Sequence, residues 1–515
     1  MVMGKATRTK RTIQNSRMSL LLFLLQIFVG FYSRKVFLDY LGAEVLGVNT
    51  TLGNILSFLN LSELGIGIAM ATSLYKPIQN QDKECICEVI SVQGFLYRRI
   101  ALLLICLSIP ILIVIPWIFP SVECGVGYVY FAYVVFLSGS LFSYLWNYRQ
   151  ILIGADQKNY KLQPWIHAVR YSKIFIQIFL LVATNCGIWG WIVMELISNV
   201  VSVLVINYVL RREYPWLQHV SIPVKELLNK YHWLIVKTKQ IFVHKMALFV
   251  LEQTSPLIIY ALVSLTMVTY YSNYMVLIGY TTMLMNVIFS GMGASIGSLV
   301  AENNQKHTME VFWELFTSRI WLSGVACFAL FVLVNSFITF WIGEKYMLDE
   351  STILIMIVIM FMRVTRTVTD SFNHAFQLFG DVWAAIIEAI INLGLSLLLG
   401  YIWGLNGILI GVAISLFVIG FFWKPYYLFS RGLKTPTISY YIQYILHVSI
   451  LGASAFLTLY LAAQIEYDSK SISEVVLHHL FTVVVYVVIT FSILYVVTSS
   501  MRRFTIRMLN LVKKK

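Results

Sequence analysis

The chain has 515 residues, of which 59% are hydrophobic and only 12% are charged, and its mean hydropathy is +0.78. This composition excludes a water-soluble protein of ordinary make-up and indicates an all-α polytopic membrane protein. The net charge of +14 could suggest a nucleic-acid partner. The basic residues gather instead in the loops of one side and in a final Lys-Lys-Lys tail, so we expect anionic lipid headgroups and no nucleic acid.

Apolar runs found with a window of roughly 19 residues predict about 14 membrane-spanning helices. Each run can cross a hydrocarbon core of about 30 Å at 1.5 Å per residue. The predicted spans cover residues 18–33, 48–74, 99–119, 127–148, 165–183, 188–209, 235–262, 270–300, 317–340, 352–376, 383–402, 405–428, 437–463 and 475–498.

The loops on alternate sides differ in charge. Of the 38 Lys and Arg residues, 28 are assigned to the side that holds both termini, including bases near span ends such as Lys237, Arg319 and Lys424, and six more are assigned to the apolar runs. The other side holds only four, namely Arg34, Lys35, Lys345 and Lys470. Short loops rich in Lys and Arg remain in the cytoplasm, so both termini are predicted to be cytoplasmic. The first apolar run has no small-residue cleavage pattern after it, which predicts that it is retained.

Two segments of the chain, residues 152–201 and 377–418, repeat one pattern. In each, a Gly-Ala or Gly-Asp turn opens a helix that ends at G-x-x-G, and the next helix carries Ile-Ser. Six spans on each side of a long inside loop predict parallel repeats around a central cavity. The expected domains are an N-terminal six-helix bundle (1–209), a cytoplasmic linker (210–234), a C-terminal six-helix bundle (235–430), two additional transmembrane helices (437–498) and a basic cytoplasmic tail (499–515).

Six basic residues lie within predicted spans. A charge near the bilayer centre costs about 2.5 kcal/mol or more, so one that is retained usually faces a cavity and has a partner. The alternative is that Arg366 pairs with Asp370, and that residues near a membrane end extend their charge to the interface. We expect these bases to bind an anionic substrate group such as a pyrophosphate: Arg170, Lys173, Lys239, Lys245, Arg363 and Arg366.

Acidic groups also lie within the spans. Arg363, Arg366, Asp370 and His374 share one stripe of the tenth predicted helix. A buried carboxylate tends to take up a proton, which suits a proton relay, although Glu63 could instead cap a neighbouring helix. The candidates for ion coupling or ion pairs are Glu63, Glu252, Asp370, His374 and Glu388, and Glu195 is a further acid in an apolar run.

The cysteines indicate no metal site and no functional thiol. Cys85-x-Cys87 has no second ligand pair, so a zinc site is not expected. Cys124 and Cys186 are both predicted on the outside, where a disulfide between them is compatible with the sequence but undetermined. No cofactor and no catalytic residue are expected.

The segment FLDYLGAEVLGVNTTLGNILSFLNLSELGIGIAMATSLYKPIQNQDKE (residues 37–84) resembles the bacterial polysaccharide-biosynthesis flippases. These are the Wzx-type transporters of O-antigen, capsule or exopolysaccharide repeat units, within the multidrug/oligosaccharidyl-lipid/polysaccharide exporter superfamily. The resemblance spans about residues 10–435. Further matching segments are IFVHK (241–245), YYSNY (270–274), ASIGSLVAE (294–302), FWIGEKYML (340–348) and AAIIEAIINLGLSLLLG (384–400).

This resemblance implies two six-helix bundles that rock between inward- and outward-open states in the bacterial inner membrane. It implies that undecaprenyl-pyrophosphate-linked oligosaccharide units move to the periplasmic leaflet, and that a polysaccharide polymerase and a chain-length regulator are partners. Basic cavity residues of the family are thought to hold the pyrophosphate, and Lys245 matches such a position. The chain departs from the family at Ser255, where many relatives carry an acid, so a coupling role for Glu252 nearby is open.

Two other functions remain as alternatives. A polymerase or O-acyltransferase of the same pathway would need a sizeable outside loop, and the largest one expected here is only residues 34–47. A cation-coupled drug antiporter of the same superfamily would need an acidic cavity for cationic drugs, whereas the cavity predicted here is basic on balance. We therefore expect a flippase and not an enzyme.

Overall fold

The computed structural model describes residues 5–60, 66–120, 122–156, 158–184, 186–218, 223–233, 254–289, 296, 299–300, 304–376, 378, 380–465 and 472–513. All regular secondary structure in these residues is helical, which confirms the predicted fold class. The chain divides into two compact units. The first holds Met1–Tyr260 and Leu265–Thr269, and the second holds Ala261–Ser264 and Tyr270–Lys515.

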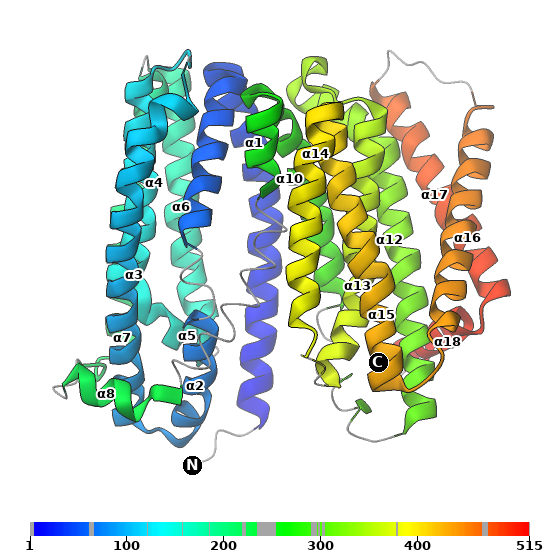
Figure 1. The fold of residues 1–515 in the computed structure, drawn as a ribbon, viewed down its shortest axis with the longest axis horizontal. Helices are drawn as coiled ribbons and strands as arrows, with labels where there is room; N and C mark the ends of the chain where they lie inside the picture. The colour runs from blue at the N-terminus through cyan, green and yellow to red at the C-terminus, as the bar shows by residue number, and fades with distance from the viewer. Residues whose placement is uncertain are drawn as a thin grey trace. The chain divides into compact units, whose positions relative to one another are not determined.

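In the first unit, long helices lie side by side, with α6 against α1 and α7, and α4 against α3 and α7 (Figure 1). Its elements are α1 (Lys5–Leu59), α2 (Ile66–Asn80), α3 (Lys83–Ile118), α4 (Val126–Leu145), η2 (Asn147–Gln150), α5 (Ile151–Ala155), α6 (Asn159–Ala183), α7 (Gly187–Glu213) and α8 (Val224–Lys230). The predicted outside loop at residues 34–47 is wrong in extent, because the backbone is helical on both sides of Gly42. Gly42 alone makes the kink, at a φ of 80° that a residue with a Cβ rarely adopts.

In the second unit, α12 packs against α13, α17 and α18, and α16 packs against α17. Its elements are α10 (Leu265–Phe289, whose first residues belong to the first unit), α12 (Gln305–Ile342), η3 (Glu344–Tyr346), α13 (Glu350–Ala375), α14 (Val382–Ser415), the π-helix η4 (Leu416–Trp423), α15 (Lys424–Tyr427), the π-helix η5 (Leu428–Leu433), α16 (Ile438–Ala462), α17 (Ile472–Val497) and α18 (Ser499–Lys513). The tail expected after residue 499 is thus largely a helix.

Nine helices in the described ranges are long and apolar enough to cross a membrane, so the chain is a multi-pass membrane protein. Helices suit this environment because they satisfy their own backbone hydrogen bonds without water. One candidate, Trp383–Leu433, joins two predicted spans across a kink at Trp403 and Gly404. The predicted seventh span, 235–262, lies largely outside the described residues.

The two G-x-x-G segments have a common geometry. Gly187 and Gly404 both have positive φ, at 51° and 58°, so each permits a turn that side chains with a Cβ resist. Three residues later, a second glycine lies where an added side chain would be crowded. A Cβ at Gly190 would lie 2.7 Å from the Cβ of Cys186, and one at Gly407 would collide with the carbonyl of Leu399.

An aromatic cluster forms part of the core of the second unit. The ring of Phe312 on α12 contacts Phe316, Phe372 of α13, Phe429 of η5 and Tyr440 of α16, with centroid distances between 5.1 and 6.5 Å. Offset and edge-on contacts of this kind add about 0.5–1.5 kcal/mol each beyond area burial. The cluster therefore fixes α13, which carries several of the candidate residues, against its neighbours.

All six cysteines are free thiols, including Cys124 and Cys186. The disulfide that the sequence left open between these two is not formed.

Candidate substrate-binding site

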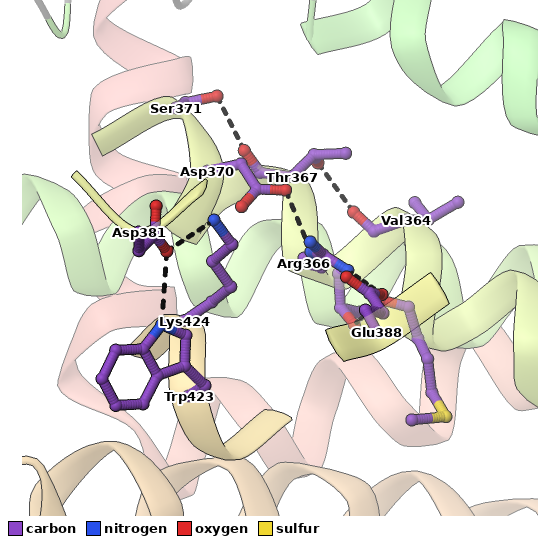
Figure 2. Close-up of polar contacts among 11 residues, drawn as sticks. Val364, Arg366, Thr367, Asp370, Ser371, Asp381, Glu388, Trp423 and Lys424 are labelled. Atoms are coloured by element: carbon purple, nitrogen blue, oxygen red, sulfur yellow. Dashed lines mark hydrogen bonds and ion pairs between the residues drawn. The ribbon is translucent and has the colours of Figure 1, made fainter. Parts of the chain in front are cut away.

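Arg366 lies at the centre of a charged cluster between α13 and α14 (Figure 2). Its Nη1 is 2.6 Å from Oε1 of Glu388, and its Nε is 3.2 Å from Oδ2 of Asp370. The pair with Asp370, one helical turn later, is the one that the sequence spacing offered as an alternative. The pair with Glu388 joins two different helices. With both acids ionised, the cluster carries one net negative charge.

The pair between Arg366 and Glu388 is shielded from solvent, whereas the side chain of Asp370 is 35% exposed. The side chain of Glu388 is 0% exposed and that of Arg366 is 13% exposed. Two charges removed from water are retained only if they are well paired, and loss of one partner costs about 3–5 kcal/mol. One turn after Glu388, Asn392 donates a hydrogen bond of 3.2 Å to Ser415 Oγ. The buried side of α14 is therefore polar as well as apolar.

The π-helix η4 packs beside the side chain of Arg366. Gly420 of η4 faces the guanidinium side chain, and a Cβ there would lie 3.3 Å from Cδ of Arg366. π-Helical turns are rare and often occur at functional sites. A small cavity beside Arg366 has room for about one water molecule and far too little for a glycan. Its lining residues are Met362, Thr365, Arg366, Leu416, Gly420, Phe421, Tyr440 and Tyr444.

The other members of the α13 stripe have different surroundings. Arg363 is half-buried, one turn before Arg366. His374 is exposed, because it lies in the last turn of the helix. The predicted stripe thus brings Arg366 and Asp370 into one cluster, which is completed from α14.

In the first unit, Lys173 of α6 pairs with Glu195 of α7. Its Nζ lies 2.9 and 2.8 Å from the two carboxylate oxygens. Gln177, one turn further along α6, donates a 2.8 Å hydrogen bond to the carbonyl of Trp191. Arg170 lies one turn before Lys173 and is exposed. The two bases that share a face in the sequence therefore differ in burial and partners.

Four predicted site residues lie outside the described residues: Glu63, Lys239, Lys245 and Glu252. Their roles stay predictions.

Arg319 is a buried base that the sequence reasoning missed. It is 2% exposed, and it donates hydrogen bonds to the carbonyls of Val364 (3.1 Å) and Met285 (3.2 Å) and to Oδ1 of Asn286 (3.0 Å). Arg319 is only the third residue of the predicted span 317–340, so it was counted with the bases of the adjoining loop. The helix cap was the available signal: Asn304 accepts from the backbone N–H of His307, so Arg319 lies about 21 Å into the helix by rise.

A second missed cluster follows the Gly-Asp turn of the second repeat. Oδ2 of Asp381 is 2.7 Å from Nζ of Lys424 and accepts from Nε1 of Trp423 at 3.3 Å (Figure 2). The first repeat has a counterpart, because Asp156 accepts a 2.8 Å hydrogen bond from the hydroxyl of Tyr214. In both repeats a buried aspartate lies before one helix and accepts a hydrogen bond from a side chain near the end of the following helical segment. The repeated Gly-Ala and Gly-Asp turns were the sequence signal.

The described candidates are thus mainly ion pairs between helices. Such pairs can exchange a carboxylate for a phosphate oxygen, since guanidinium and ammonium groups bind both anions. Within the described parts of the chain, no group of three or more His, Cys, Asp and Glu side chains could hold a metal ion.

No protein-family model matches the sequence, and no curated protein matches it either. Among solved structures, the lipid II flippase MurJ in an inward closed conformation is similar, with a TM-score of 0.64 and 16% identity over 92% of this chain and 99% of that chain. An inward-facing multidrug resistance MATE family transporter of the MOP superfamily is similar with a TM-score of 0.58 and 16% identity, over 81% of this chain and 99% of that one. The chain therefore has the fold that these membrane transporters share.

Proposed function

We propose that this chain flips undecaprenyl-pyrophosphate-linked oligosaccharide repeat units from the cytoplasmic to the periplasmic leaflet of a bacterial inner membrane, by alternating access, for surface polysaccharide biosynthesis. The observation that carries the proposal is the likeness to a lipid II flippase, which covers 92% of this chain against 81% for the multidrug transporter. The sequence motifs at residues 37–84 support the same substrate class. A polymerase and a chain-length regulator would then use the flipped units.

The ion pairs offer a way to bind the pyrophosphate. This group carries two or more negative charges and needs several Lys and Arg donors once it leaves water. Lys173 and Arg366 are held by Glu195 and Glu388 in this structure. An arriving phosphate oxygen would replace the carboxylate at each base. The released carboxylate, costly as an ion in a low-dielectric site, would take up a proton, which couples binding to proton movement.

The test is flipping by the purified protein in liposomes that contain an undecaprenyl-pyrophosphate-linked oligosaccharide. The fraction of glycan open to oxidation by membrane-impermeant periodate should rise faster with the protein than in protein-free liposomes. A Lys306→Gln variant, which changes an exposed base, should behave as the wild type does. Failure to flip the lipid-linked glycan, together with uptake of a cationic drug by the same liposomes, would favour the drug-antiporter alternative instead.

A further inference from the structure

Helix α18 begins where a membrane span ends. The helix α17 is a candidate span that ends at Val497, and α18 begins two residues later at Ser499. So short a connection keeps the start of α18 within the headgroup layer of the bilayer. Figure 1 shows α18 in red, close to the N-terminal end of α12.

The sequence of α18 and the residues after it is basic and amphipathic. Residues 499–515 contain no acid and six bases: Arg502, Arg503, Arg507, Lys513, Lys514 and Lys515. At 100° per residue, Met501, Phe504, Met508 and Val512 share one face of the helix, and Arg503 and Arg507 lie on the opposite side. This pattern is typical of helices that lie in the membrane interface.

The first turn of α18 is fixed to the second unit, and the later turns are open. Met501 is fully buried, and Ser500 Oγ is 2.7 Å from Thr317 Oγ1 on α12. Further along, Ile506 and Leu509 are 54% and 55% exposed, and Arg502 is exposed. Exposed apolar side chains beside an exposed guanidinium, at the depth of lipid headgroups, suit a surface with acyl chains below and phosphates above.

Glu314 of α12 orients two of the arginines. One of its oxygens is 3.1 Å from Nη2 of Arg507, and the other is 3.5 Å from Nε of Arg503. The glutamate side chain is only 5% exposed, whereas those of the two arginines are 41% and 45% exposed. A guanidinium has five N–H donors, so each arginine can meet a second anion on its exposed side.

We propose that α18 is a binding helix for anionic phospholipid. Arg502, Arg503 and Arg507 bind the lipid phosphates, and Glu314 competes with the lipid for the last two. The charge of the segment is complementary to an anionic bilayer surface, and its exposed leucine and isoleucine match the acyl region. This site is separate from the transported substrate, so the proposal holds whichever substrate the protein carries.

The experiment uses the full-length protein in phosphatidylcholine nanodiscs that contain phosphatidylglycerol, with a fluorescent amino acid in place of Ile506. Quenching by nitroxide-labelled phosphatidylglycerol is compared with quenching by nitroxide-labelled phosphatidylcholine at equal mole fraction. We expect stronger quenching by the anionic lipid, and loss of the difference at about 1 M salt, where charges are screened beyond about 3 Å. Equal quenching by the two lipids at low salt would overturn the proposal.

Variants of α18 test whether the charges of its arginines, and not a change in its fold, determine the preference for the anionic lipid. Arg502→Gln/Arg507→Gln should reduce the preference for the anionic lipid by about five-fold per arginine, whereas Arg502→Lys/Arg507→Lys should retain it. The matched control Lys306→Gln/Arg431→Gln removes two other exposed bases of the same unit and should leave the preference unchanged. If the arginine-to-glutamine pair behaves as this control does, α18 does not select lipid by charge. Glu314→Gln should raise the preference for the anionic lipid. If the preference does not rise, Glu314 does not compete with the lipid for the arginines.

Discussion

Glu388 is fully buried, and its carboxylate lies 2.6 Å from the guanidinium of Arg366. Arg366→Ala leaves the buried carboxylate of Glu388 without its partner, so it should destabilise the protein by about 3–5 kcal/mol. Glu388→Ala should cost less, because Arg366 keeps its pair with Asp370. Thermal unfolding of the purified protein in detergent measures this loss. The apolar pair Arg366→Met/Glu388→Leu should recover much of it, because the one charge that remains, on Asp370, is 35% exposed.

Arg170 provides the control for this prediction. It is an exposed base in a span, and Arg170→Ala should change the free energy of unfolding by less than about 0.5 kcal/mol. A double variant no more stable than Arg366→Ala would contradict the ion-pair account.

Two further bases that the sequence predicts for the pyrophosphate site, Arg363 and Lys245, make a prediction about transport. Arg363→Ala and Lys245→Ala should each lower glycan flipping in liposomes while the amount of folded protein stays normal. Lys245→Arg should rescue only in part if the site is tight, because the guanidinium fork differs in shape from an ammonium group. If the Arg363→Ala/Lys245→Ala protein flips the glycan at the wild-type rate, neither residue is part of the substrate-binding site.

At the residue scale, ion pairs between residues close in sequence could be predicted, and ion pairs between residues on different helices could not. Arg366 and Asp370 are four residues apart on a helix, so their pairing follows from helical geometry. The partner Glu388 lies on another helix, and its choice depends on how α13 and α14 pack, which hydropathy does not contain. Arg319 was missed for a related reason: hydropathy places the edge of the span at residue 317, but the helix itself begins 12 residues earlier, at Gln305.

Two glycines at the kink in α14 are required for different reasons. Gly404→Ala should cost about 1–2 kcal/mol, because its φ of 58° is unfavourable for a residue with a Cβ. Gly407→Ala should cost more, since the new Cβ would collide with the backbone of Leu399. Gly394→Ala is the control within the same helix: nothing lies within 4 Å of its Cβ position, so it should be neutral or stabilising by up to about 1 kcal/mol. Equal thermal stabilities of all three variants would contradict this division of roles.

The start of α13 makes a prediction about pH. Burial opposes the charge of Asp349, but hydrogen bonds from Ser351, Thr352 and Asn406 outweigh it and lower the pKa of Asp349 to about 2, from an ordinary 3.8. A lowered pKa means that the ionised cap stabilises the fold above about pH 4 and loses this effect as the pH falls toward 2. Asp349→Ala should therefore cost about 1 kcal/mol at pH 6, the usual value for an N-cap.

The measurement is thermal unfolding of the wild type and of Asp349→Ala between pH 2 and 6. Other carboxylates titrate in both proteins, so the difference between the two isolates this cap. The difference should shrink between about pH 4 and 2, and a constant difference would show that the charge of Asp349 has no part in it.

At the element scale, the sequence predicted the existence of helices better than their ends. Apolar period and length define the buried part of each span, but α3 extends 16 residues before the predicted start at residue 99. Caps such as Asp82, which accepts from the backbone N–H of Cys85, set the actual start. The helix α18 was expected only as a basic tail, because its amphipathic pattern lies outside any window of continuous hydropathy.

At the scale of the whole molecule, the fold class could be predicted because few structures can cross a lipid bilayer. A chain this apolar must satisfy its backbone inside lipid, which favours helices that span the membrane. The substrate does not follow in the same way, because a site is made from side chains on spans far apart in sequence. Arg366 with Glu388 and Lys173 with Glu195 show that bases counted from the sequence as free binding groups are neutralised once the helices pack.

The orientation of the chain in the membrane is the remaining prediction, and it rests on the split of 28 loop bases against four. Bases in short loops resist translocation, so the basic side should be cytoplasmic. Reporter fusions after residues 220, 310 and 515 should report cytoplasm, and fusions after residues 42, 123 and 468 should report periplasm. Residue 123 lies between α3 and α4, and residue 468 lies between α16 and α17, so these two fusions follow complete helices, whereas residues 42 and 310 lie within α1 and α12. Because each span reverses the side, one missed or extra span would invert every later site. Two or more inverted fusions would therefore contradict the predicted spans, and a uniform inversion would contradict the charge rule alone.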